Sequence, residues 1–77
     1  MTWTVRLHNI PEDKIEDLLE YCSQAELKDP TFRVDVEERK NGKIRYVIIK
    51  CESKDQAFKR GVLFHSRFNC FFEVEWV

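Results

Sequence analysis

The side chains most able to do chemistry in this sequence are one tyrosine and the cations spaced around it. Tyr46 and Lys50 lie four residues apart in the apolar segment "IRYVIIKC", and Arg6 lies in a similar segment, "VRLH". A tyrosine ring offers a flat surface on which another ring can stack, and a nearby cation attracts negatively charged groups. These residues form a candidate binding surface if the fold places them side by side.

Side chains typical of catalysis or metal binding do not occur in the patterns that those functions need. Cys22, Cys51 and Cys70 are widely spaced and form no CxxC pair, which disfavours a zinc site and a disulfide framework. The chain also has no glycine-rich phosphate loop and no nucleophile motif. We therefore expect a non-catalytic protein without cofactors, whose cysteines are buried and reduced, as is typical of the cytoplasm.

The composition is that of one small folded domain over residues 1–77. The chain is 43% hydrophobic, and its 13 basic and 14 acidic residues nearly cancel to a net charge of −1. A general nucleic-acid-binding protein is usually basic, so the net charge gives that function no support. No apolar run approaches the roughly 20 residues that cross a membrane. We expect a domain that works alone and does not bind membranes.

Hydrophobic periodicity predicts strands at four places and helices at two. The segments whose side chains alternate between apolar and polar, as in half-buried strands, are residues 3–8, 32–37, 44–51 and 70–77. One helix face is predicted from the spacing of Ile15, Leu18, Leu19 and Cys22. A second helix face is predicted from Ala57, Gly61 and Phe64, widened by Phe58 and Val62.

Local signals predict where these helices begin. Asp13 with Glu16, and Ser53 with Gln56, have the spacing of a capping box. Gly61 weakens a helix by about 1 kcal/mol relative to alanine, so we expect it to have a packing role.

The dipeptide Asn41-Gly42 lies between the second and third strand segments and predicts a tight hairpin. A two-residue type I′ turn needs positive φ at both central residues, which asparagine and glycine tolerate. Such a turn would place Val34 opposite Ile49 and Val36 opposite Val47 on one face. This shared apolar face supports the register.

The order strand, helix, strand, strand, helix, strand predicts an α+β fold. Right-handed crossovers around a central hairpin give a ferredoxin-like βαββαβ sandwich, whose four-stranded antiparallel sheet has the order 4-1-3-2. Both helices would cover one face and leave the other open. Trp3 and Trp76 should then meet on the helix side, at the same end of the sheet.

This layout resembles the RNA-recognition motif family over nearly the whole chain. "VRLHNI" is similar to the family's first-strand hexamer, "IRYVIIKC" to its octamer, and "ESKDQA" to the following helix start. The resemblance implies RNA bases stacked on exposed strand aromatics. The first-strand aromatic position holds Arg6, and the octamer's two stacking positions hold Tyr46 and Ile48.

Strand alternation predicts which residues lie on the open face. The candidate binding residues are Arg6, His8, Arg33, Tyr46, Ile48, Lys50 and Phe71. The hairpin adds the basic residues Arg39, Lys40, Lys43 and Arg45. Acidic side chains share the face, at Asp35, Glu37, Glu73 and Glu75, and would weaken the attraction of phosphates.

The open face and the last strand predict a binding module. Tyr46, Ile48 and Phe71, rimmed by both charge signs, suit a protein partner. The segment "CFFEVEWV" is very apolar for an edge strand, and exposed edges template pairing with another chain. We expect a protein partner, or a second copy in a homodimer joined through this strand. The alternative is single-stranded RNA bound by Tyr46 and the neighbouring basic residues.

Overall fold

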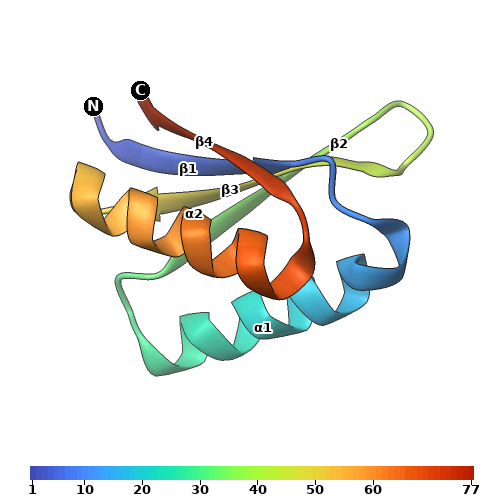
Figure 1. Cartoon of the computed structure of the whole chain (residues 1–77), viewed down its shortest axis with the longest axis horizontal. Coiled ribbons are helices and arrows are strands. Elements are labelled where there is room, and N and C mark those ends of the chain that lie inside the picture. Colours follow the sequence, from blue (N-terminus) through green and yellow to red (C-terminus); the bar gives the residue numbers. More distant parts are fainter.

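The computed structural model describes residues 1–77 and has the predicted order of elements (Figure 1). The strands are β1 Trp3–His8, β2 Arg33–Glu38, β3 Ile44–Cys51 and β4 Phe71–Trp76. They form one four-stranded sheet in the order β2-β3-β1-β4, with every neighbouring pair antiparallel. The helices are α1 Ile15–Lys28, preceded by the short 3-10 helix η1 Glu12–Lys14, and α2 Lys54–Phe68. The predicted α+β fold with its sheet order is confirmed.

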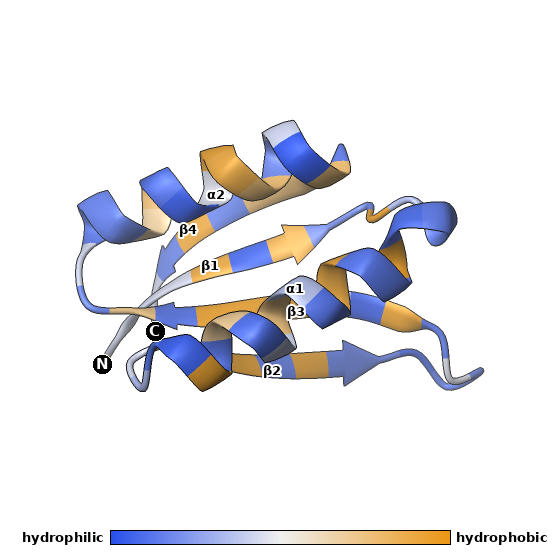
Figure 2. Cartoon of the chain, turned by 90° about the horizontal axis from the view of Figure 1, so that it is seen from below, coloured by the Kyte–Doolittle hydropathy of each residue, from blue (hydrophilic) through white to orange (hydrophobic).

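Both helices lie on one face of the sheet (Figure 2), and buried apolar side chains fill the space between the helices and the sheet. α2 packs on β1 and β4, whereas α1 lies toward β2. The side chains with no exposed surface include Val5, Leu7, Leu18, Val47, Ile49 and Phe64. Neither helix has the length and apolar character that crossing a membrane requires.

The hairpin between β2 and β3 has the predicted strand register but not the predicted turn. The Arg39 N–H donates to the Lys43 carbonyl, which makes the loop three residues long. Gly42 has a φ of +83°, whereas Asn41 is not among the residues with positive φ, so the type I′ prediction is wrong. The Asn41 side chain instead accepts a hydrogen bond from the Lys43 N–H at 3.0 Å.

A β-bulge explains how the register survives the different turn. Glu38 pairs with Ile44 and Glu37 with Tyr46, so Arg45 is the extra residue on β3. Beyond the bulge, Val36 faces Val47 and Val34 faces Ile49, as predicted.

Only one of the two predicted helix caps forms. The Ser53 hydroxyl accepts a hydrogen bond from the Gln56 N–H at 3.0 Å, which confirms the predicted cap. The Gln56 side chain accepts a hydrogen bond in return from the Glu52 N–H at 2.8 Å, one residue before the position expected in a capping box. Asp13 lies inside η1, and α1 begins after Lys14 without a side-chain cap. The Lys14 N–H donates to the Pro11 carbonyl at 2.9 Å, so a backbone turn replaces the expected cap.

The three cysteines are reduced and buried, in the core positions that the patterns predict. Burial, followed by the nearby Glu26 carboxylate, raises the pKa of the Cys22 thiol to about 12. This thiol therefore stays un-ionised at neutral pH, and it behaves as a small apolar side chain.

The two tryptophans meet as predicted. Trp3 and Trp76 are paired residues of β1 and β4, and their ring centroids are 5.1 Å apart. Trp3 packs against the buried core, whereas Trp76 is 50% exposed. Trp76 is thus an edge residue whose indole is only half covered.

Gly61 has the packing role expected of it. A Cβ at this position would lie 2.2 Å from a carbon of the Phe72 ring. Its absence lets α2 approach β4 over Phe72. The buried residues of α2 are Ala57, Gly61, Phe64 and Phe68. Phe58 and Val62 are 47% and 57% exposed, so their assignment to the core-facing stripe is wrong.

We expect Gly61→Ala to destabilise the protein although alanine favours helices. The helix gains about 1 kcal/mol, but the inserted methyl group must displace the Phe72 ring, and overpacking costs about 1–3 kcal/mol. The free energy of unfolding in a denaturant titration should fall by about 1 kcal/mol. Ser66→Ala, at an exposed position of the same helix, is the control and should leave stability equal or slightly higher. A stabilised Gly61→Ala protein would contradict the close contact.

Candidate functional site

The open face of the sheet brings together the strand residues predicted as a binding surface. Strand pairing places Arg6 next to Ile48 and His8 next to Phe71. Lys50 lies between Thr4 on one side and Arg33 on the other. The face is therefore continuous across all four strands.

Arg6 occupies the centre of this face and is held by two carboxylates of β4. Its Nη2 donates to Glu73, and its Nε lies 3.0 Å from Glu75 Oε1. The hydrogen bond from Arg6 lowers the pKa of the Glu73 carboxyl. Because two carboxylates surround one guanidinium, this part of the face carries net negative charge and opposes phosphate binding.

Tyr46 is half-buried, and guanidinium groups lie over its ring. The central carbons of Arg6 and Arg45 are 4.7 Å and 4.9 Å from the ring centroid. Both contacts are within the range of cation–π attraction. Part of the ring surface that a stacked base would use is therefore already occupied.

The basic hairpin residues separate into two groups. Arg39, Lys40 and Arg45 line a groove of about 550 Å³ together with His8 and Tyr46. Lys43 instead forms an ion pair with Glu12 at 3.0 Å. The groove lies where β1 ends beside the hairpin, and its lining includes the Glu38 carboxylate as well as these cations and the rings of Tyr46 and His8.

Phe71 lies at the β4 edge and not at the centre of the open face. Its ring is 6.1 Å from the His8 ring and 6.0 Å from the His65 ring, between centroids. The side chain is 52% exposed. Phe71 is thus accessible from beyond the edge of the sheet.

Further exposed apolar side chains continue along β4 and the side of α2 next to it. We call this surface the β4 flank, and its exposed members are Phe58, Val62, Phe71, Trp76 and Val77. Phe58 packs edge-on against Phe72 of β4, with ring centroids 6.4 Å apart, which places this side of α2 toward the edge strand. Val62 follows one helical turn after Phe58 and shares its face.

Helical spacing predicts Phe58 and Val62 in the core, but the same spacing also contains the information that they are not needed there. The sequence Ala57, Gly61, Phe64, Phe68 already completes one buried stripe with helical spacing. Phe58 and Val62 each come one residue after a member of that stripe, about 100° around the helix.

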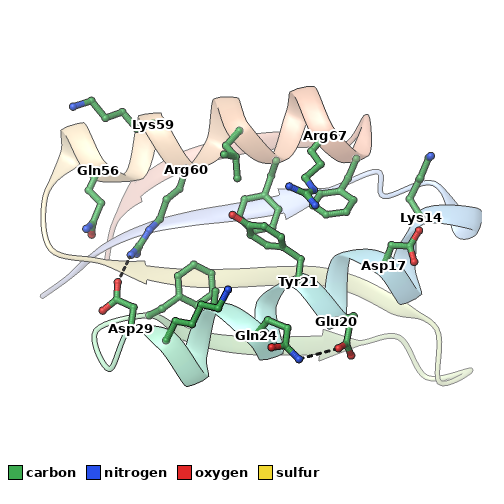
Figure 3. Close-up of a pocket in the computed structure, with 16 residues that line it drawn as sticks. Lys14, Asp17, Glu20, Tyr21, Gln24, Asp29, Gln56, Lys59, Arg60 and Arg67 are labelled. Carbon is green, nitrogen blue, oxygen red and sulfur yellow. Dashed lines mark hydrogen bonds and ion pairs between the residues drawn. The ribbon is translucent and has the colours of Figure 1, made fainter.

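A second groove, which the sequence patterns did not indicate, runs between α1 and α2 (Figure 3). It has a volume of about 1010 Å³ and apolar walls that include Tyr21, Phe64 and Phe68. Arg67 lies over the Tyr21 ring at 4.8 Å. It also has a charged rim, formed by Lys14, Asp17, Glu20, Lys28, Asp29, Lys59, Arg60 and Arg67. The rim is basic on the α2 side, at Lys59, Arg60 and Arg67, and carries both charge signs on the side of η1 and α1 (Figure 3).

Arg60, at one end of this groove, connects α2 to β3 and to the segment between α1 and β2. Its guanidinium donates to the Lys50 carbonyl at 3.1 Å, lies 3.6 Å from Asp29 and covers the Phe32 ring at 4.8 Å. Its side chain is only 14% exposed. The charge of Arg60 is therefore engaged in contacts within the protein.

No three His, Cys, Asp or Glu side chains come together as a potential metal site. His8 and His65 both pack on Phe71, and the ring nitrogen of His65 lies 2.8 Å from the Cys70 carbonyl oxygen. In comparisons with known proteins, no family model, no curated protein and no solved structure matches this chain.

Proposed function

We propose that this chain is a small non-catalytic module that binds another protein through the β4 edge and the β4 flank. The observation that carries this proposal is the distribution of exposed apolar side chains. Of the nine large hydrophobic residues that are exposed, five belong to the β4 flank. Exposed apolar side chains gathered along one edge of a domain are typical of interaction sites. The buried, reduced thiols are compatible with a cytoplasmic location.

The backbone of β4 supports the same surface. β4 is an outer strand that pairs only with β1, so its other edge has unpaired N–H and C=O groups. Natural edges are usually protected by prolines, bulges or charges. The β1–β4 ladder runs without a register shift, and only Glu73 and Glu75 protect it. β2, by contrast, has only Val36 as a large exposed apolar residue, and the charged side chains of Arg33, Asp35, Glu37 and Glu38 are exposed along it.

The test is a pair of variants that add the same charge to two different helices. Val62→Asp places a carboxylate in the β4 flank, and Leu27→Asp places one on α1, where Leu27 is 81% exposed. Immobilised wild-type protein and both variants are incubated with the same cell extract, and retained proteins are identified by mass spectrometry.

A specific partner should be retained by wild-type and Leu27→Asp protein and lost from the Val62→Asp protein. We expect at least a tenfold loss, because a buried charge without a partner costs well over about 1.4 kcal/mol, which is tenfold in affinity. Equal retention by all three proteins would contradict binding through the β4 flank.

A second candidate function is the binding of single-stranded RNA. The groove beside the hairpin favours it, because Tyr46 and His8 share this groove with Arg39, Lys40 and Arg45. The resemblance of "IRYVIIKC" to the octamer of RNA-recognition motifs supports the same use. We rank it second because Asp35, Glu37, Glu73 and Glu75 share the open face and oppose phosphates.

A further inference from the structure

The outer edge of β4 has different chemistry on its two faces. We propose that it binds an extended partner segment in which basic and apolar side chains alternate, and that this segment adds to the sheet as a fifth strand. The inference rests on the proposed function and specifies the chemistry of the partner.

The backbone of β4 is suited to strand addition. Six residues, Phe71–Trp76, are paired with β1 on one side without a bulge. The pair continues at Val77, where the N–H donates to the Thr2 carbonyl at 3.0 Å. A partner strand would gain main-chain hydrogen bonds along this length, which give affinity without sequence preference. Preference must therefore come from the side chains on the two faces.

On the open face, the edge begins with the exposed ring of Phe71 and then presents uncompensated negative charge. Glu73 and Glu75 share the single guanidinium of Arg6, and their side chains remain 52% and 35% exposed. Directly opposite side chains on neighbouring strands lie about 4.5–5.5 Å apart at Cβ. Lysine or arginine on an added strand would therefore stand beside these carboxylates, whereas an acidic residue would be repelled.

On the helix face, the same edge is apolar. Phe72, Val74 and Trp76 point to this side, and α2 runs alongside β4 (Figure 2). Phe58 and Val62 of α2 extend this apolar surface from the strand onto the helix. Alternate residues of an added strand would meet Trp76 and Val62, so apolar side chains are favoured at these positions.

The charges also decide against a second copy as the partner. In a continuous antiparallel sheet formed by two β4 strands, residues on the same face stand opposite each other. Each register that joins the strands then sets Glu73 or Glu75 against a glutamate of the other copy or leaves it without a cation. Like charges directly opposite destabilise a strand pair.

Synthetic peptides test this proposal on the intact protein. An eight-residue peptide of alternating lysine and valine is compared with three others. One has the valine nearest to the middle replaced by proline, one has glutamate for every lysine, and one has serine for every lysine. Affinity is measured by fluorescence anisotropy, and the site is mapped by backbone amide chemical shifts.

We expect the lysine peptide to bind and to shift the amides of residues 71–77. The proline peptide has the same charge but cannot complete the ladder, and should bind at least about tenfold more weakly. The glutamate peptide should not bind. Equal binding of the lysine and proline peptides would overturn strand addition, because it would show charge attraction alone.

Two double variants locate the charge that selects the peptide. Glu73→Gln with Glu75→Gln should weaken the lysine peptide about fivefold to tenfold, since exposed ion pairs contribute modestly. Asp35→Asn with Glu37→Gln changes the net charge equally, but on the β2 edge, and should leave the affinity unchanged. Equal weakening by both double variants would overturn the assignment to β4. Unfolding curves of each variant confirm that it is folded.

Two results separate this inference from the proposed function. If the serine peptide shifts the β4 amides and binds as tightly as the lysine peptide, the basic partner is refuted while protein binding at β4 stands. If the Val62→Asp protein retains the same partners as wild type, the proposed function itself fails. A stable dimer that protects the β4 amides in the free protein would overturn the inference in favour of a second copy.

Discussion

Replacing Phe64 with alanine should remove a large part of the stability of the fold. Phe64 has no exposed surface, and its ring packs edge-on against Tyr21, with centroids 5.4 Å apart, and against Phe68 at 5.7 Å. Truncating a buried phenylalanine costs about 3–5 kcal/mol, because the cavity is only partly refilled. A chain of 77 residues is expected to be stable by about 4–12 kcal/mol, so this loss is a large fraction of the total.

Phe58→Ala is the matched control for this prediction. It makes the same change in the same helix, at a side chain that is 47% exposed, and should cost about 1 kcal/mol. Guanidinium titrations of both variants give the two free energies of unfolding. Similar losses would mean that both phenylalanines are in the core, as the helical periodicity had suggested. The β4 flank would then lose Phe58.

The strands of this protein were predictable because a strand has only two faces. Along β2 and β3, apolar residues occur at alternate positions and so lie on one face of the sheet. A shift of the strand register by one residue would expose all of them. The register of Val34 with Ile49 was therefore correct even though the turn was not. The turn is set by local hydrogen bonds, among them those from the Arg39 N–H to the Lys43 carbonyl and from the Lys43 N–H to the Asn41 side chain, which alternation does not encode.

The faces of α2 were less predictable, because a helix has many possible orientations. Helical spacing favoured a wide stripe that included Phe58 and Val62. The observed orientation depends on the contact of Gly61 with Phe72, which pulls one narrow stripe onto β1 and β4. A residue in another strand thus decides which helical side chains stay exposed. The groove between the helices likewise results from tertiary packing and has no local sequence motif.

On the open face, too, the placement of residues was predictable from the sequence, whereas their side-chain contacts were not. Strand alternation placed Arg6, Tyr46 and Lys50 on one face, and the register agrees. It did not indicate that Arg6 would bind both Glu73 and Glu75 while covering Tyr46. These contacts weaken the RNA hypothesis, because they engage the ring and the cation on which it depends.

Single-stranded RNA should therefore bind this protein only weakly. We expect a Kd no tighter than the nonspecific range of about 10⁻⁴ to 10⁻⁶ M at physiological salt. The net charge is −1, and the guanidinium of Arg6 is already paired. Fluorescence anisotropy with labelled single-stranded RNA, repeated at several salt concentrations, gives the affinity and its salt dependence.

The RNA affinity of Tyr46 variants shows whether the weak binding occurs at a specific site. If a base stacks on this ring, Tyr46→Ala should lose about 1–3 kcal/mol of RNA affinity, whereas Tyr46→Phe should keep most of it. Lys50→Ala should then reduce the salt slope by about one, and Lys28→Ala, on the helix side, should not. We expect instead that all four variants bind RNA as weakly as wild type, because Arg6 and Arg45 already cover part of the ring. Sub-micromolar RNA binding that Tyr46→Ala removes and Tyr46→Phe preserves would make RNA the preferred partner and displace the protein-binding proposal.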